Sequence, residues 1–292
     1  MKVLLLGASG FIGRSIAAKS PSTVELTATY LSNKPDIVGM NIERLDCLDT
    51  SLDWSHIVNQ YDCIIIAARA SAGTQSAREQ LSHKMQAVFS RLTHAVRESD
   101  SNTFLVAVNG SLSYGDRGDE IVQSTDSINP IGFAESYSIA EQPFRHFLEE
   151  DNNIAIIRAP WVIGNGSWFV QMYLQANKIP IIKHGNQWMA LVFVDDLADY
   201  VWNVVQSQKN GIFHPKLTYR CRQRDFAAIV QEVTQKQTHT LGRFKLRAVE
   251  KQMRESIVAS IRMDDGMMHQ SENESSRENL KAIIENIYSG FS

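Results

Sequence analysis

The feature that most constrains the fold is a glycine-rich turn near the start of the chain, at Gly7, Gly10 and Gly13. It follows the apolar run of residues 3–6, which is typical of a buried parallel strand, and precedes residues 14–19, which can continue as a helix. Such a turn leaves backbone N–H groups pointing outward, where the helix dipole adds partial positive charge. Glycine is needed where a side chain would meet a pyrophosphate or where φ must be positive. Because the pattern directly follows a strand, it predicts a dinucleotide site rather than a tight turn that binds nothing.

Length and charge limit the classes of protein to consider. A chain of 292 residues can bury a large core, as one domain or as a main domain with an appendage. The net charge of −3 gives no reason to expect nucleic acid or an anionic membrane as a partner. No apolar run reaches the length of a membrane span, and the chain enters its first strand without a signal segment. We therefore expect a cytoplasmic protein.

The three cysteines predict no chemistry. Cys47, Cys63 and Cys221 are odd in number and lack the spacing of metal ligands. Cys63 lies inside an apolar run, where a free cysteine behaves as a small buried hydrophobe. We therefore expect no metal site.

Apolar runs alternate with helical patterns through the first 160 residues. Further strands are expected at residues 24–30, 62–68, 103–108 and 154–157, with a short one at 43–46. Residues 79–97 place five apolar side chains on one face of a helix: Leu81, Met85, Val88, Leu92 and Val96. Wholly apolar strands that alternate with helices predict an α/β fold, a Rossmann-type doubly wound parallel sheet.

The alternation weakens after Pro160. Helices are expected near residues 168–176, 196–206 and 224–234, and short strands near 191–194 and 212–214. The polar segment 264–276 is expected to be a mobile loop. The last helix should begin with a capping box formed by Ser275 and Glu278, and its apolar stripe should dock on the body of the protein.

Four motifs, in this order, resemble those of the extended short-chain dehydrogenase/reductase superfamily, in its NAD-dependent epimerase/dehydratase group acting on nucleotide sugars. They are the turn GASGFIG, Ser113-Tyr114-Gly115-Asp116, the stretch RAPWVIG of residues 158–164, and FVDDLA of residues 193–198. The resemblance implies an NAD(P)-binding Rossmann domain at residues 1–160. It also implies a small substrate-binding C-terminal lobe at residues 161–292, interleaved with the sheet, and a homodimer. The last fifty or so residues match no part of the family pattern.

Catalysis in this family depends on a Tyr and a Lys four positions apart and on a nearby Ser, and this sequence can be aligned with that pattern in two registers. In the first, Tyr137 keeps the tyrosine position and Glu141 replaces the lysine. In the second, Glu141 matches a family glutamate, so the tyrosine position falls on Phe133 and the lysine position on Tyr137. We prefer the second register because Pro130 precedes Phe133 as a proline tends to precede the family's tyrosine. The family's charge-assisted Tyr–Lys pair is missing in both.

Three polar residues near the expected reaction centre are the candidates for catalysis: Tyr137, Tyr114 and Ser111, which stands beside the family's serine position at Gly110. A tyrosine one helical turn from the usual site can still act as an acid or base, or it can merely pack. Pro143 should make the helix that carries Tyr137 begin late or bend.

The resemblance also assigns contacts to the cofactor. They fall on Gly7, Ser9, Gly10, Phe11, Ile12, Gly13, Tyr30, Ser32, Lys34, Asp46, Cys47, Ala67, Ala68, Arg69, Asn109 and Pro160. Thr29 stands near the position of the family's NAD-selecting Asp, so a ribose 2′-phosphate is tolerable and NADP is preferred to NAD. Asp46 is equally well explained as a loop residue that caps a helix, and Arg69 as a surface charge.

Two functions remain open. The first is an NAD(P)-dependent oxidoreductase or epimerase that acts on a small molecule, in particular a nucleotide sugar, with an altered proton relay. The second is a dinucleotide-binding regulator or partner subunit without dehydrogenase activity. The fold alone does not decide between them.

Overall fold

The computed structural model describes residues 1–37, 40–150, 152–267 and 270–290. The chain forms two compact units. The first comprises Met1–Asn109, Ser136–Arg158 and Ala198–Phe213, and the second Gly110–Glu135, Ala159–Leu197 and His214–Ser292. Because the chain passes between the units several times, a single boundary in the sequence does not separate them.

The first unit is built on a parallel sheet with the strand order β11-β7-β5-β4-β1-β2-β3 in the described chain. Its strands are β1 (Lys2–Leu6), β2 (Glu25–Tyr30), β3 (Asn41–Arg44), β4 (Cys63–Ile66), β5 (Phe104–Gly110), β7 (Ile154–Ala159) and β11 (Gly211–Phe213). Apart from Lys2 at the start of β1, the strands β1, β4 and β7 are buried along their length, as expected for a sheet covered on both faces. The predicted α/β fold with a Rossmann-type parallel sheet is confirmed.

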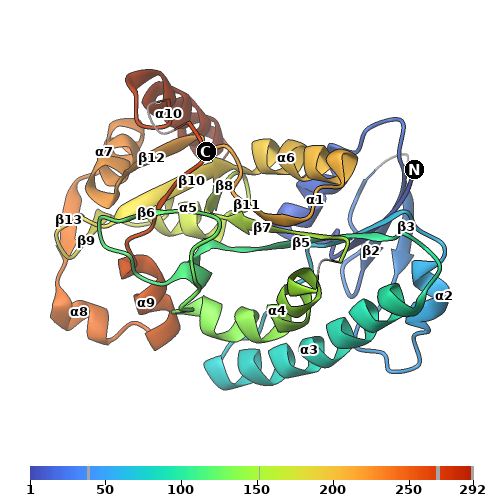
Figure 1. Cartoon of the computed structure of the whole chain (residues 1–292). Coiled ribbons are helices and arrows are strands. Elements are labelled where there is room, and N and C mark those ends of the chain that lie inside the picture. Colours follow the sequence, from blue (N-terminus) through green and yellow to red (C-terminus); the bar gives the residue numbers. More distant parts are fainter. Residues whose placement is uncertain (38–39, 151, 268–269, 291–292) are drawn as a thin grey trace. The chain divides into compact units, whose positions relative to one another are not determined.

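Helices cover both faces of this sheet. They are α1 (Phe11–Ala18), α2 (Trp54–Val58), α3 (Gln75–Glu98), most of α4 (Phe133–Glu149) and most of α6 (Val194–Ser207). Figure 1 shows α3 and α4 on one face and α1 and α6 on the other. The rings of Phe89 and Phe144, 4.7 Å apart, join α3 to α4. Trp202 Nε1 donates to the carbonyl oxygen of Ile16 at 2.8 Å, which joins α6 to α1. In a doubly wound sheet of this kind, ligands bind at the carboxyl ends of the strands, because helices cover both faces.

The sequence suggested that Pro143 would make α4 begin late or bend, and the late start is wrong. The helix begins at Phe133 and continues through Pro143 to Glu149. A proline has no N–H to donate to the preceding turn, and tertiary packing offsets this loss here. Phe144 and Phe147, which follow the proline, are almost completely buried in the core of the unit.

The second unit contains a three-stranded sheet in the order β12-β10-β8, formed by β12 (Tyr219–Arg222), β10 (Trp188–Phe193) and β8 (Trp161–Ile163). Helices α5 (Trp168–Leu174), α7 (Gln223–Thr234) and α10 (Glu274–Ser289) share one apolar core with it. Two parallel strand pairs complete the sheets: β9 (Ile179–Ile182) with β13 (Thr238–Leu241), and β6 (Ile121–Val122) with β14 (Arg262–Met263). The 3₁₀ turn η1 (Ser111–Tyr114) and helices α8 (Arg243–Arg247) and α9 (Lys251–Val258) complete the unit.

The C-terminal helix begins differently from the prediction. Its N-cap is Asn273, whose Oδ1 accepts a hydrogen bond from Ser276 N at 2.9 Å, so the predicted cap at Ser275 is wrong. The preceding segment is irregular but is anchored to the unit. The buried Arg220 side chain donates to Glu272 Oε1 at 2.7 Å, and Asp265 Oδ2 accepts from Leu217 N at 3.1 Å. Residues 268–269 of the expected mobile loop lie outside the described residues.

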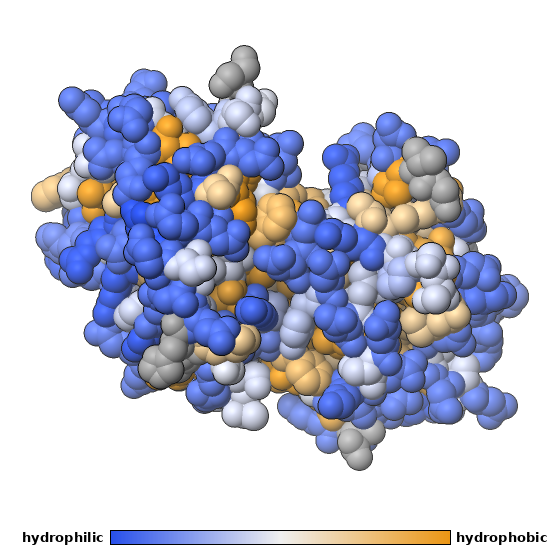
Figure 2. Space-filling model, turned by 90° about the horizontal axis from the view of Figure 1, so that it is seen from above, coloured by the Kyte–Doolittle hydropathy of each residue, from blue (hydrophilic) through white to orange (hydrophobic). Residues whose placement is uncertain are grey.

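On the face shown in Figure 2, hydrophobic residues occur in small patches separated by hydrophilic ones. None of the described helices is long and apolar enough to cross a membrane.

Candidate functional site

The glycine turn has no room for side chains at two of its three glycines. Gly7 has φ +93°, and a Cβ on it would lie 2.7 Å from Ala68 N. A Cβ on Gly13 would lie 2.1 Å from Gly7 O, so the first turn of α1 packs directly on the backbone of the loop. Gly10 is the N-cap of α1, and among the described residues a Cβ there would meet only Gly7 O, at 3.4 Å. Gly7 and Gly13 are therefore required for the conformation of the turn, and at Gly10 no side chain covers its backbone.

The backbone of the turn keeps several donors available. Ala8 N donates to Thr29 O at 2.8 Å and Gly10 N to Gly7 O at 3.1 Å, which fixes the loop against β2. The N–H groups of Ser9, Phe11 and Ile12 have no backbone acceptor within the described parts of the chain. Free N–H groups at a helix start form a binding site for an anion. The turn therefore fits a pyrophosphate.

The end of β2 has no acidic side chain. Thr29 is buried, and its hydroxyl donates to Leu5 O of the neighbouring strand β1 at 3.0 Å. Tyr30, the last residue of β2, pairs in register with Arg44 of β3, and Arg44 Nε donates to Leu31 O at 3.1 Å. Ser32 and Lys34 follow in the exposed loop. Arg44 was not among the residues singled out from the sequence, which predicted only a short strand at residues 43–46.

Asp46 and Cys47 follow β3 in a turn. Asp46 Oδ1 accepts from Leu48 N at 2.9 Å, whereas the helix that begins nearby is capped by Asp53. Burial, followed by the charge of Asp46, raises the pKa of the Cys47 thiol to about 11. Cys47 is therefore a neutral thiol at physiological pH, able to pack against a ligand but not to react with it as a thiolate.

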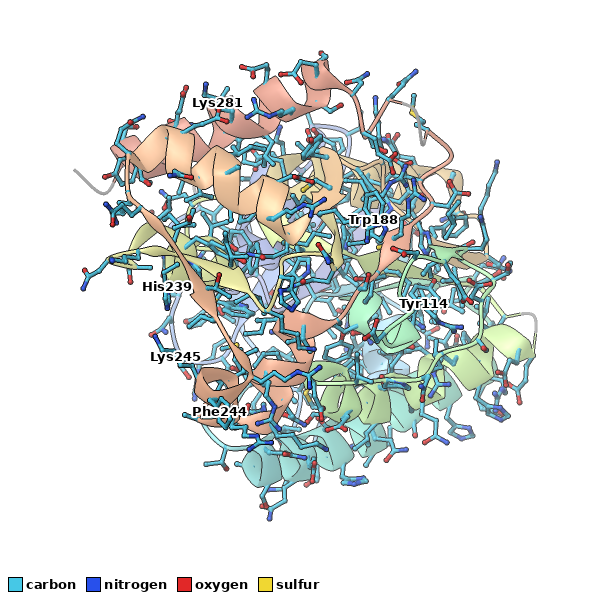
Figure 3. The ribbon with its side chains drawn as sticks, turned by 90° about the vertical axis from the view of Figure 1, so that its left-hand side faces the viewer. Tyr114, Trp188, His239, Phe244, Lys245 and Lys281 are labelled. Atoms are coloured by element: carbon cyan, nitrogen blue, oxygen red, sulfur yellow. The ribbon has the colours of Figure 1, made fainter. Side chains whose placement is uncertain are left out.

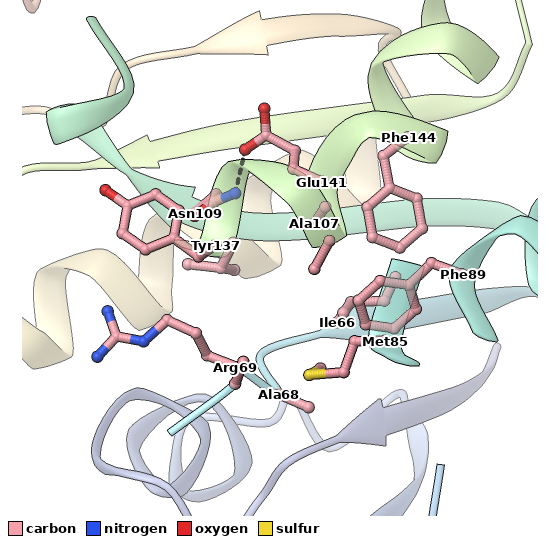
Figure 4. A pocket seen from close by; sticks show the side chains of 13 residues that line it. Ile66, Ala68, Arg69, Met85, Phe89, Ala107, Asn109, Tyr137, Glu141 and Phe144 are labelled. Carbon is pink, nitrogen blue, oxygen red and sulfur yellow. Dashed lines mark hydrogen bonds between the residues drawn. The ribbon is translucent and has the colours of Figure 1, made fainter. Parts of the chain in front are cut away.

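A small pocket of about 30 Å³ lies within the first unit, among the ends of β4 and β5 and helices α3 and α4 (Figure 4). Its residues are Ile66, Ala68, Arg69, Ala70, Met85, Phe89, Ala107, Val108, Asn109, Tyr137, Ala140, Glu141 and Phe144. Arg69 and Tyr137 lie together at one side, with the guanidinium carbon 5.8 Å from the ring centroid, and Met85 and Phe89 lie at the other. The pocket therefore has a polar side and an apolar side.

A buried carboxylate closes the polar side of this pocket. Both oxygens of Glu141 accept from the Arg158 guanidinium, with Nη2 to Oε1 at 2.7 Å, and Asn109 donates to the same carboxylate. Arg145 Nε lies 3.3 Å from Glu141 Oε1. The side chains of Arg158 and Glu141 are 0% and 1% exposed, so the charge of Glu141 is neutralised inside the protein. Sequence reasoning had named both residues as family motif positions but had not foreseen that they form a pair.

Several predicted site residues belong to the second unit. Pro160 joins β7 to β8, and Ser111 is buried in η1. Tyr114 is 1% exposed, and its hydroxyl lies 2.8 Å from His214 Nε2. His214 Nδ1 lies 2.6 Å from Asp264 O and donates to it, because a carbonyl oxygen can only accept, and the Tyr114 hydroxyl also donates to Ser124 O at 3.3 Å. This placement favours a packing role for Tyr114.

The structure thus brings together Ala67, Ala68 and Gly7 at the turn, and Arg69, Asn109 and Tyr137 at the pocket. No group of three or more His, Cys, Asp or Glu residues in the described ranges is arranged to hold a metal ion.

Comparison with solved structures shows the fold. The UDP-N-acetylglucosamine 4-epimerase from Methanobrevibacter ruminantium M1, in complex with UDP-N-acetylmuramic acid, is similar over 99% of this chain and 97% of its own, with 16% identity and a TM-score of 0.77. The UDP-glucuronic acid 4-epimerase from Bacillus cereus, in complex with UDP-glucuronic acid and NAD, has 15% identity and a TM-score of 0.74 over 100% of both chains. The human epimerase family protein SDR39U1 (isoform 2), with NADPH, gives 15% identity and a TM-score of 0.74 over 99% of both chains.

Comparison with curated protein sequences finds no match. A sequence model of the NAD dependent epimerase/dehydratase family matches residues 3–214, which include the glycine turn, all of the parallel sheet of the first unit except Lys2, and the residues of the pocket. The chain therefore belongs to the NAD dependent epimerase/dehydratase family.

Proposed function

We propose that this protein is an NADP-dependent oxidoreductase or epimerase that acts on a nucleotide sugar. It would transfer the proton to or from the substrate oxygen without the family's Tyr–Lys pair. The observation that carries the proposal is the glycine turn, with two glycines that accept no side chain and three N–H groups that have no backbone acceptor among the described residues. Similar structures contain NAD with UDP-glucuronic acid, or NADPH, which supports the same class of ligands here.

The end of β2 supports the choice of NADP. An NAD-selective site uses a carboxylate that accepts from the ribose 2′-hydroxyl, and residues 29–35 contain no carboxylate. Arg44 and Lys34 can balance the negative charge of a 2′-phosphate, and Ser32 can donate to it. The Tyr30 ring would contact the adenine of the bound cofactor.

The proton would be handled by Tyr137. Helix α4 contains no lysine between Phe133 and Glu149, so the family's ammonium group has no equivalent on this helix. Tyr137 lies at the polar side of the pocket, where Arg69 is the nearby cation and the charge of Glu141 is held by Arg158. A bound nicotinamide would supply or accept hydride. Tyr137 would give a proton to the substrate oxygen or take it, and Asn109 would orient that oxygen.

The experiment is turnover of a panel of UDP- and dTDP-sugars with NADPH and NADP⁺, for the wild type, Tyr137→Phe and the control Tyr200→Phe. Tyr200 lies on α6, away from the pocket residues. We expect Tyr137→Phe to lower kcat by about a hundredfold or more with little change in NADPH affinity, and Tyr200→Phe to leave both unchanged.

NADPH binding without turnover of any sugar nucleotide would contradict the enzymatic part of the proposal and favour a binding-only regulator. If the protein binds neither NADPH nor NADP⁺, the whole proposal is contradicted. The expected cytoplasmic location and homodimer belong to the same proposal, and light scattering of the purified protein tests the homodimer.

A further inference from the structure

A basic segment in the second unit has no part in the proposed chemistry. Residues 233–249 contain four Lys or Arg residues and no Asp or Glu. They are Lys236, Arg243, Lys245 and Arg247. The chain as a whole has a net charge of −3, so this segment is a strong local departure from the average.

An aromatic side chain projects from the middle of this segment. Phe244 of α8 is 85% exposed, whereas Leu246 of the same turn is 2% exposed and packs with Ile182 and Ile257. Leu246 therefore holds α8 to the unit from one side, and Phe244 points outward from the other. Figure 3 shows Phe244 and Lys245 at the edge of the second unit, close to His239.

The cations around Phe244 are not neutralised. Within the described ranges, Arg243, Lys245 and Arg247 have no carboxylate within ion-pair distance. Lys251, on the next helix, is by contrast 3.3 Å from Glu135 and 3.8 Å from Glu255. The guanidinium carbon of Arg247 lies 5.5 Å from the Phe244 ring centroid, so positive charge and the exposed ring share one surface.

We infer that this surface, formed by Arg243, Phe244, Lys245 and Arg247, binds the headgroup region of an anionic membrane. An aromatic ring inserts at the depth of the headgroups, and flanking Lys and Arg side chains contact anionic lipids. A protein partner would require a core of several apolar residues, and Phe244 is the one large exposed hydrophobic residue in the described part of this segment. A single projecting ring among cations that have no carboxylate partner in the described ranges therefore favours the lipid surface. The binding is peripheral and does not depend on the proposed enzymatic function.

The test is sedimentation of the full-length protein with vesicles of phosphatidylcholine alone, or with about 30% phosphatidylserine added. We expect binding to the anionic vesicles only, and its loss at high salt. Phe244→Ala should lower the partition coefficient roughly tenfold, and Lys245→Glu by tenfold or more. The matched control is Lys281→Glu, which changes the net charge equally but lies on α10, far from Phe244 in Figure 3, and should change binding by less than about twofold.

A Phe244→Trp variant gives a direct readout of insertion. Its added fluorescence should shift to the blue with anionic vesicles and be quenched by lipids with brominated chains, while the circular dichroism of every variant stays that of the wild type. The inference is overturned if the wild type does not sediment with either vesicle, or if Phe244→Ala binds as well as the wild type. It is equally overturned if Lys281→Glu weakens binding as much as Lys245→Glu.

Discussion

Gly13→Ala should lower the stability of the protein, whereas Gly10→Ala should lower its affinity for NADPH, although the two glycines are only three residues apart. A Cβ on Gly13 would lie 2.1 Å from Gly7 O, 2.9 Å from Gly7 C and 3.0 Å from Ala8 Cα. These are backbone atoms that cannot rotate away, so the turn must open by close to an ångström. Overpacking of this kind costs about 3 kcal/mol. That cost lowers the Tm by roughly 6–12 °C for a chain of this size.

Gly10 is free of that constraint. A Cβ there would lie 3.4 Å from Gly7 O, an ordinary contact, and its φ of −75° suits any residue. The stability of Gly10→Ala should therefore stay within about 1 kcal/mol of the wild type. The new methyl group would instead occupy the space through which a pyrophosphate approaches the backbone, and NADPH affinity should fall by at least about tenfold.

The assay is thermal denaturation followed by circular dichroism, together with calorimetric titration of NADPH. Gly242→Ala is the control, because a Cβ on Gly242 would meet no atom of the residues that the structure describes within 4 Å. Gly13→Ala melting like the wild type, or Gly10→Ala binding NADPH as tightly as the wild type, would contradict the close packing of Gly13 and the role of Gly10 in pyrophosphate binding.

Three further predictions concern stability and reactivity. Asn273→Ala should destabilise the protein by about 1 kcal/mol in urea denaturation, and Ser275→Ala should not, because Asn273 caps the last helix; the reverse order would contradict this cap. Glu141→Gln should cost roughly 3 kcal/mol in the same assay, because it leaves the buried charge of Arg158 without its partner, and a loss below about 1 kcal/mol would show that the pair is not desolvated. Cys47 should react with iodoacetamide at pH 8 roughly a hundredfold more slowly in the folded than in the unfolded protein, because its pKa is raised to about 11; equal rates would contradict this burial.

The strands and the glycine turn could be predicted because their causes are local. Residues 3–6 of β1 and all of β4 are apolar, and only a sheet covered on both faces buries them completely. The start of α3 was expected four residues late because its first turn is polar. The helix begins after Thr74, whose hydroxyl accepts from Ala77 N at 3.3 Å, a cap that the apolar stripe does not reveal.

The charged contacts of the site could not be predicted because they join different strands and helices, 13 and 17 residues apart, and a local sequence pattern does not show which of these elements meet. Arg44 reaches Leu31 through the pairing of β2 with β3, and Glu141 meets Arg158 where α4 crosses β7. The cap at Asn273 was missed for a different reason. Asn273 and Ser275 are both good N-cap residues, and the choice between them depends on how the anchored segment enters the helix.

The measurement that tests the account most directly is calorimetric titration of NADPH and NADH into the wild type and Arg44→Ser. We predict that the wild type binds NADPH at least about tenfold more tightly than NADH, and that Arg44→Ser loses most of this preference while keeping its affinity for NADH. Tighter binding of NADH, or no binding of either dinucleotide, would contradict the account.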